Sequence, residues 1–303
     1  MNLRDLEYVV AVAEEEHFGR ASERCHVSQP ALSGQIKKLE DQLGVQLFER
    51  TNRRVAVTPI GAEVVEKAKR ALMIADEIRD AAAASADPLS GTLRFGTIPT
   101  IGPYLLPSIL RPLKAALPNM QLTISEDFTH NLEHRLSIGD IDVAVTATDI
   151  RENGLSEILL YDEPFRVALP EGHPLDTGKT IDVTSLDGAE LLLLKDGHCL
   201  SDQVARLCGL TRKSTVSGLD TQASSLETIV GLVAAGAGIT FLPVSMTGDQ
   251  GTFRTGISIR KATNKAARRT VRMIFRETFP KRAMLAAMSA VIGEHLPTGV
   301  TAI

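Results

Sequence analysis

The sequence predicts an α/β protein that opens with a winged helix-turn-helix, continues through one long helix and ends in a larger α/β region. Three observations predict this order. Short helical segments joined by a tight connection are followed by two short strands within the first 58 residues. An uninterrupted helical pattern then covers residues 59–84. From residue 92 onward, strand-like and helix-like segments alternate, which is typical of sheets covered by helices.

The first segment contains three expected helices and a wing. Apolar residues recur at helical spacing over residues 3–16 and again over 19–25. A third helix opens at Ser28, whose hydroxyl suits an N-cap, and Gly44 suits its end. Two short strands, expected at 47–50 and 55–57, then flank the turn 51–54 and complete a winged helix-turn-helix.

A long helix is expected to begin at Thr58 and Pro59, which are typical of an N-cap and a first turn, and to reach about Ala84. Its small and apolar residues alternate in steps of four and three, which forms a heptad seam: Val64, Ala68, Ala71, Ala75, Ile78 and Ala82. So long a stripe needs a partner surface, so we expect a dimer helix. The alternative is a linker helix that packs on its own chain. Residues 85–91 form a linker.

The remaining chain is expected to form parallel sheets covered by helices. The expected strands are residues 92–98, 121–125, 143–147, 165–168, 190–194, 239–242 and 271–275. The expected helices are residues 105–116, 130–138, 203–207, 226–235 and 282–295.

Composition narrows the class of protein. The net charge is −4, and the first 60 residues hold eight basic and nine acidic side chains, so charge alone does not indicate a nucleic-acid partner. The longest uncharged run, 228–248, contains glycines and a proline and fits a buried helix and strand better than a membrane span. The first residues lack the pattern of a signal peptide, so we expect a cytoplasmic protein.

Three cysteines are present, Cys25, Cys199 and Cys208. In the cytosol thiols stay reduced, so a disulfide there would be a redox device rather than a structural staple. Cys25 fits a small buried hydrophobe in the second helix. Cys199 precedes Ser201, a suitable N-cap, and a thiolate is favoured at a helix N-terminus.

The segment ASERCHVSQPALSGQIKKLEDQLGVQLFER (residues 21–50) and the later TPIGAEVV resemble the helix-turn-helix of LysR-type transcriptional regulators. The rest is similar to the LysR effector region, so the resemblance covers essentially the whole chain. It implies a two-lobed effector domain built like a periplasmic binding protein. It also implies three partners: double-stranded operator DNA, RNA polymerase, and further copies of the chain in a homodimer or homotetramer.

The resemblance also implies the division of the chain. We expect a DNA-binding domain at residues 1–58, a dimerisation helix with its hinge at 59–90, and an effector domain at 91–303. The effector lobes are expected to consist of residues 91–162 with 269–303, and of residues 163–268.

The third helix of such a domain places its N-terminal side chains on base edges in the major groove. Gln29 can pair with adenine, and Ser33 and Gln35 can also read base edges. The wing arginines suit contacts to the DNA backbone or minor groove, although an isolated pair could be a solvated turn. The expected DNA-binding residues are Ser28, Gln29, Pro30, Ser33, Gln35, Lys37, Lys38, Arg50, Arg53 and Arg54.

Within the LysR family, several stretches resemble the members that sense hydrogen peroxide: RDLEY, CHVSQP, IPT, GPYLLP, DGHCL and SLET. This resemblance implies that Cys199 is the peroxidatic thiol and Cys208 the resolving thiol, with a cellular thiol reductant restoring both. It implies a peroxide pocket whose members are Thr100, Thr129, His198, Asp202, and Arg268 or Arg269. No metal or cofactor is expected.

If residues 201–207 are helical, the two thiols lie at opposite ends of that helix, too far apart for a disulfide. Oxidation must then melt the helix, and Gly209 eases that change. Two other functions remain open. A small organic anion could bind between the lobes near residues 97–100, at a strand end. The second open function is that of a thiol peroxidase, although the helix-turn-helix argues against an enzyme.

Overall fold

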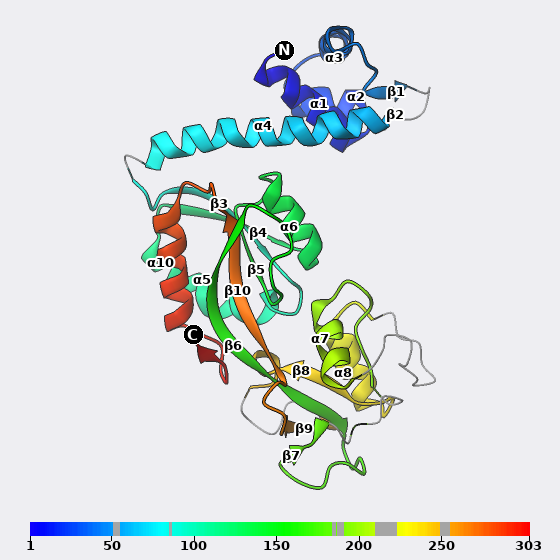
Figure 1. The fold of residues 1–303 in the computed structure, drawn as a ribbon, viewed down its shortest axis with the longest axis vertical. Coiled ribbons are helices and arrows are strands. Elements are labelled where there is room, and N and C mark those ends of the chain that lie inside the picture. The colour runs from blue at the N-terminus through cyan, green and yellow to red at the C-terminus, as the bar shows by residue number, and fades with distance from the viewer. Residues whose placement is uncertain (51–54, 85–86, 184–185, 187–190, 210–222, 249–254) are drawn as a thin grey trace. The chain divides into compact units, whose positions relative to one another are not determined.

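A computed structural model describes the chain except residues 51–54, 85–86, 184–185, 187–190, 210–222 and 249–254 (Figure 1). The chain forms two compact units. One consists of residues 1–86 with 137–140, and the other of residues 87–136 with 141–303. None of the described helices is both long and apolar enough to cross a membrane.

The first unit contains the predicted helix-turn-helix and wing strands. Its elements are α1 (Leu3–Glu15), α2 (Phe18–Arg24), α3 (Gln29–Leu43), β1 (Phe48–Arg50), β2 (Val55–Val57) and α4 (Pro59–Ala84). β1 and β2 pair antiparallel. The predicted helices and strands of this unit are confirmed to within one or two residues at their ends.

Local chemistry explains where these helices begin and end. The Ser28 hydroxyl accepts a hydrogen bond from the backbone N–H of Ala31 at 3.4 Å, and Gly44 ends α3 in the left-handed conformation with φ 69°. The Thr58 hydroxyl accepts from the N–H of Gly61 at 2.9 Å and caps α4. A Cβ on Gly61 would lie 2.1 Å from the carbonyl oxygen of Leu47, so only glycine lets α4 start this close to the strand.

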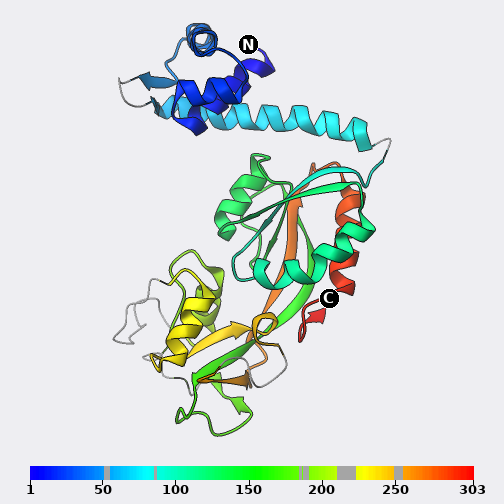
Figure 2. The same ribbon diagram turned by 180° about the vertical axis from the view of Figure 1, so that it is seen from behind.

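The described residues of the second unit form a mixed α/β structure with nine strands. Figures 1 and 2 show how its helices and strands are arranged. Its strands are β3 (Gly91–Thr97), β4 (Met120–Glu126), β5 (Val143–Thr146), β6 (Leu155–Pro170), β7 (Thr180–Ile181), β8 (Thr240–Pro243), β9 (Ile257–Ala262), β10 (Arg268–Arg276) and β11 (Thr301–Ala302). Its helices are α5 (Gly102–Ala116), α6 (Thr129–Ser137), α7 (Cys199–Leu207), α8 (Leu226–Ala234), α9 (Val244–Thr247) and α10 (Arg282–Glu294).

The expectation of parallel sheets is wrong for most strand pairs. β3 pairs in parallel with β4 and β5, but β10 runs antiparallel to β5 and β6, and β6 runs antiparallel to β8 and β9. The reason is that β6 is 16 residues long and carries the chain from one core to the other, and β10 returns it. Of β6, only residues 165–168 were predicted as a strand. Charged side chains interrupt the apolar pattern in the part of β6 that precedes them.

Two hydrophobic cores lie at either end of β6, and they define two lobes. The first lobe gathers buried residues of β3, α5, β5 and α10, and the second gathers those of β8, α8 and α7. Cys199 packs into the first core, whereas Leu200 and Val204 of the same helix pack into the second. The first residue of α7 therefore lies where the two lobes meet.

Candidate functional site

The exposed face of α3 carries most of the predicted DNA-binding residues. Ser28, Gln29 and Pro30 are exposed at its start, and Ser33 is half-buried. Lys37 and Lys38 are exposed and have no ion pair within the described part of the chain. Their charged groups are therefore accessible for the predicted contacts to DNA phosphates.

Gln35, another residue of the predicted DNA-binding set, is half-buried and makes a contact inside its own unit. Its side-chain amide donates to the Asp5 carboxylate at 3.1 Å, and Asp5 is buried on α1. Gln35 lies beside the buried positions Leu32, Ile36 and Leu39 of α3, and its hydrogen bond to Asp5 links α3 to α1. Arg53 and Arg54 lie outside the described residues, as does the side chain of Arg50.

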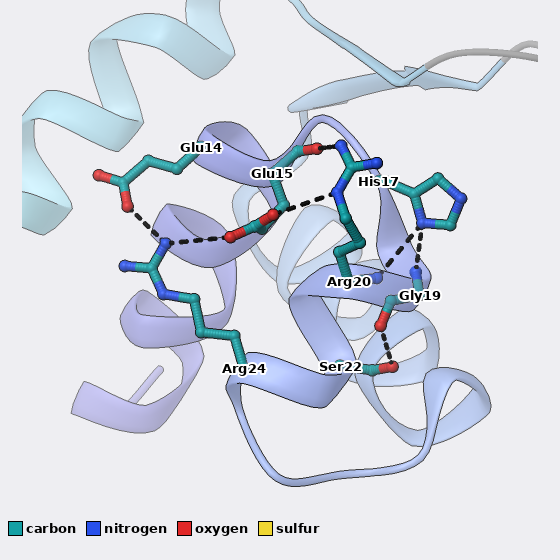
Figure 3. Close-up of polar contacts among 7 residues, drawn as sticks. All are labelled: Glu14, Glu15, His17, Gly19, Arg20, Ser22 and Arg24. Carbon is teal, nitrogen blue, oxygen red and sulfur yellow. Dashed lines mark hydrogen bonds and ion pairs between the residues drawn. The ribbon is translucent and has the colours of Figure 1, made fainter.

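The acidic residues at the end of α1 are paired within the same unit, as Figure 3 shows. Arg24 lies 2.7 Å from Glu14, and the Arg20 Nε lies 3.2 Å from Glu15. His17 caps α2, since its Nδ1 accepts from the backbone N–H groups of Gly19 and Arg20. These exposed pairs add little stability, but they balance the acidic cluster and fix how α1 meets α2.

The thiol site is built on the first turn of α7. Cys199 is the first residue of this helix and is 9% exposed. The helix begins at Cys199, four residues before the predicted range 203–207, and its N-cap is His198 and not Ser201. The Ser201 hydroxyl instead donates to the carbonyl of Leu194 at 2.8 Å and holds the first turn on the second lobe.

The two neighbouring arginines of β10 point in opposite directions, because successive side chains on a strand alternate. Arg269 is fully buried, and its Nη1 and Nη2 donate to the Thr100 hydroxyl at 2.9 Å and the Thr100 carbonyl at 2.7 Å. Arg268 is 57% exposed and lies 3.3 Å from Asp162. Arg269, and not Arg268, is therefore the arginine whose charge acts on Cys199.

Opposing influences set the state of the Cys199 thiol. Burial raises its pKa above the ordinary value. The charge of Arg269 and the hydroxyl of Thr129 lower the pKa, and the carboxylate of Asp202, one turn along the helix, raises it. The expected lowering by the helix N-terminus is outweighed, because the sulfur is removed from water.

Two buried polar atoms of this region have no conventional hydrogen bond, although the Thr129 hydroxyl interacts with the Cys199 sulfur. The Thr129 hydroxyl oxygen makes no full hydrogen bond among the described residues, and the same holds for the His198 Nε2. Burial and the nearby Lys195 lower the pKa of His198, so its ring is neutral. The edge of Phe128 packs against that ring, with the ring centres 4.8 Å apart. Each of these atoms retains the capacity for a hydrogen bond to a small polar ligand.

Comparison with known proteins decides the family. Residues 3–62 match the model of the bacterial regulatory helix-turn-helix protein of the lysR family, and residues 86–297 match the LysR substrate binding domain. The chain belongs to the LysR family.

Relatives of this LysR protein include the hydrogen peroxide-inducible genes activator of Dickeya chrysanthemi, 40% identical over 98% of this chain and 96% of the relative. Full-length OxyR C199D from Pseudomonas aeruginosa has a TM-score of 0.80 and 39% identity, covering 98% of this chain and 99% of that one. An H2O2-bound mutant of Corynebacterium glutamicum OxyR has a TM-score of 0.66 and 35% identity, covering 97% and 92%.

Glu163 of this LysR protein was missed by the sequence interpretation. Its side chain is fully buried beside Arg269, with 2.7 Å between the Arg269 Nη2 and its carboxylate oxygen. In the sequence, Glu163 follows the charged Asp162 and looks like a surface residue. Its burial could have been predicted only if the buried face of the strand were already known, because side chains alternate between the two faces.

The second thiol lies at the other end of α7 of this LysR protein. Cys208 is the C-cap residue, and its N–H donates to the carbonyl of Val204 at 3.0 Å. It is half-buried against the second core, and burial raises its pKa to about 11. Cys25, at the end of α2, is also half-buried against apolar neighbours, and burial raises its pKa.

Proposed function

We propose that this LysR-family protein is a hydrogen-peroxide-sensing regulator that binds operator DNA and switches through a Cys199–Cys208 disulfide. The observation that carries the proposal is the thiol site. A buried Cys199 lies beside a buried arginine and two orphaned polar atoms, those of Thr129 and His198. The similarity to hydrogen peroxide-inducible activators over nearly the whole chain supports the same function.

The proposed chemistry uses one peroxide molecule per switch. The Cys199 thiolate attacks one peroxide oxygen, the O–O bond breaks, and the second oxygen leaves as hydroxide, which takes up a proton to become water. The Cys199 sulfur is then a sulfenic acid. The Cys208 thiolate attacks that sulfur, an S–S bond forms, and the S–O bond breaks to release the second water. A thiol reductant restores both cysteines, so the protein is oxidised stoichiometrically and is not an enzyme.

Neighbouring groups fit this chemistry. Arg269 stabilises the attacking thiolate and the departing hydroxide. The Thr100 hydroxyl accepts from Arg269, which leaves its own hydrogen for a peroxide oxygen. Thr129 and His198 supply further contacts through their orphaned atoms. Asp202 helps to keep the resting thiol protonated, since its charge opposes that of the thiolate.

The proposal includes an assembly and a location. Ile74 and Ile78 are 53% and 67% exposed on α4, and we propose that this helix pairs with that of a second copy. Pairing of effector domains would make a tetramer in the cytoplasm, with RNA polymerase as a further partner. The proposed domains are residues 1–58, 59–90 and 91–303, the last divided into 91–162 with 269–303 and 163–268.

Mass spectrometry of the three thiols before and after brief peroxide treatment tests the proposal. We expect an oxidised Cys199 within the first time points and a Cys199–Cys208 disulfide afterwards, both reversed by a thiol reductant. Cys25 serves as the internal control because the arginines that act on it, Arg24 and Arg4, are exposed to solvent, unlike the buried Arg269. Equal oxidation of all three cysteines would contradict the proposal.

For the DNA interface, we expect Gln29→Ala to weaken operator binding by about 1–3 kcal/mol and to relax the preference at the base pair it reads. Gln35→Ala is the matched control, since Gln35 contacts Asp5 inside the unit and should change stability rather than base preference. Binding to a set of operator variants at fixed salt measures both. A Gln29 variant that ranks those operators as the parent does would disprove the assignment of α3.

One observation favours a second candidate, a regulator that responds to an organic anion. A cavity of about 490 Å³ lies where α7, β10 and the end of β5 meet, and Arg151, Arg206, Arg268 and Arg272 are among the residues that line it. The charge of Arg272 is already balanced by Glu157 at 2.8 Å. Calorimetry with small dicarboxylates against the reduced protein would test this second function.

A further inference from the structure

The Glu163–Arg269 pair joins two strands at the centre of the effector domain. Glu163 on β6 lies directly opposite Arg269 on β10 in the strand register. The Arg269 Nε donates to the Glu163 carboxylate at 2.8 Å, and the Nη2 lies 2.7 Å from the same oxygen. Both side chains are 0% exposed. A buried carboxylate and guanidinium must balance each other, because neither can be neutralised by water.

The second oxygen of Glu163 is also engaged. It accepts a hydrogen bond from the backbone N–H of Ser245, in α9 of the second lobe, at 3.1 Å. On the other side, the guanidinium donates to the carbonyl and hydroxyl of Thr100 in the first lobe. Glu163 is therefore held at both oxygens, and Arg269 is held at all three nitrogens.

Two anions share this one guanidinium: the Glu163 carboxylate and, when it forms, the Cys199 thiolate. We infer that Glu163 is a positioning residue for the oxidation of Cys199: by fixing the Arg269 guanidinium and balancing its charge, it sets how strongly that arginine stabilises the thiolate. The inference deepens the proposed function and rests on it. Glu163 keeps the resting thiol protonated, because an arginine already paired attracts a second anion less strongly.

Tyr104 and Tyr161 interact electrostatically with both members of the pair, and Glu227 interacts with Tyr104. Tyr104 is half-buried, and burial raises its pKa to about 12; burial also raises the pKa of Tyr161. Thr129 and Asp202 act on the Cys199 thiol. Glu163 is thus the carboxylate that balances Arg269 within the described part of the chain.

The test is the pH profile of Cys199 alkylation by iodoacetamide, followed residue by residue by mass spectrometry in the full-length reduced protein. In the parent, the midpoint should lie above the ordinary value because burial raises the pKa of Cys199. Glu163→Gln leaves the thiolate as the remaining anion for Arg269, so the midpoint should fall by about one pH unit and alkylation at neutral pH should be roughly tenfold faster. Glu163→Asp should shift it less in the same direction.

A double-mutant cycle separates this role from loosened packing, which would also lower the midpoint by admitting water. Arg269→Met should raise the midpoint. Glu163→Gln combined with Arg269→Met should then behave as Arg269→Met alone, since Glu163 acts through the arginine. The double variant has lost both partners of the buried pair and is expected to fold, which thermal unfolding checks.

Asp162→Asn is the matched control. Asp162 also pairs with an arginine of β10, Arg268, but on the exposed face, so its removal should leave the profile unchanged. The inference is overturned if Glu163→Gln keeps the parent profile, or if it accelerates alkylation equally with and without Arg269. Failure of the parent to form sulfenic acid with peroxide would instead refute the proposed function, since alkylation needs no peroxide.

Discussion

Cys199→Ser is expected to lose the peroxide response completely while keeping the fold and DNA binding of the reduced protein. The hydroxyl of serine has nearly the same volume but is not a nucleophile toward peroxide under these conditions, so no sulfenic acid forms and the later steps cannot begin. The site should tolerate the change, because Thr129 and Arg269 can both contact a hydroxyl. Operator footprinting and thermal unfolding, each with and without peroxide, measure the two parts of this prediction.

Cys25→Ser provides the matched control for that variant. Cys25 is half-buried in the first unit, and the arginines that act on it, Arg24 and Arg4, are exposed, whereas Arg269 is buried. This variant should respond to peroxide as the parent does. If the Cys199 variant still changed its footprint on peroxide treatment, or if the Cys25 variant lost the change, the sensing thiol would have been assigned wrongly.

How far the sequence predicts this site depends on how local each feature is. The N-cap at Ser28 and the glycine end at Gly44 follow from neighbouring residues, and both are confirmed. The hydrogen bond of Gln35 to Asp5, thirty residues away, could not be predicted from neighbouring residues. The N-cap at Ser201 failed for a similar reason, since its hydroxyl bonds to Leu194 on the preceding segment instead of its own helix.

The arginine pair shows the same limit at the centre of the site. The resemblance to peroxide-sensing regulators pointed to Arg268 or Arg269, and strand alternation requires that they face opposite ways. Which of them faces the thiol depends on the pairing of β10 with β6, a contact between residues about a hundred positions apart. Glu163 was missed for the same reason. Its sequence neighbours do not show that it lies opposite Arg269 in the paired strand β10.

Disulfide formation is expected to abolish the protection of α7 amides from hydrogen exchange. The two thiols lie at the ends of α7, nine residues apart, and a helical rise of about 1.5 Å per residue places their Cα atoms about 13 Å apart. A disulfide needs a separation below about 7 Å. The bond therefore cannot form while the helix is intact, and oxidised protein must have lost it.

The environment of Cys208 also favours helix opening before the disulfide forms. In the ordered helix, burial raises the pKa of Cys208 from its ordinary value of 9.0 to about 11. Release into water would return it to the ordinary value and raise the thiolate fraction roughly a hundredfold. The same opening breaks the hydrogen bond from Gln203 to the carbonyl of Ala147 at 2.6 Å, which ties α7 to the first lobe. Oxidation is thus coupled to the contact between the lobes.

Cys208→Ser separates the chemistry from the switch. In this variant, peroxide should still convert Cys199 to a sulfenic acid, but α7 should keep its protection because no disulfide holds it open. Hydrogen exchange with mass spectrometry on reduced, oxidised and re-reduced parent, beside the variant, makes the comparison. A parent that carried the disulfide and still protected residues 200–207 would rule out the order–disorder mechanism, because a closed helix keeps the two sulfur atoms at its opposite ends.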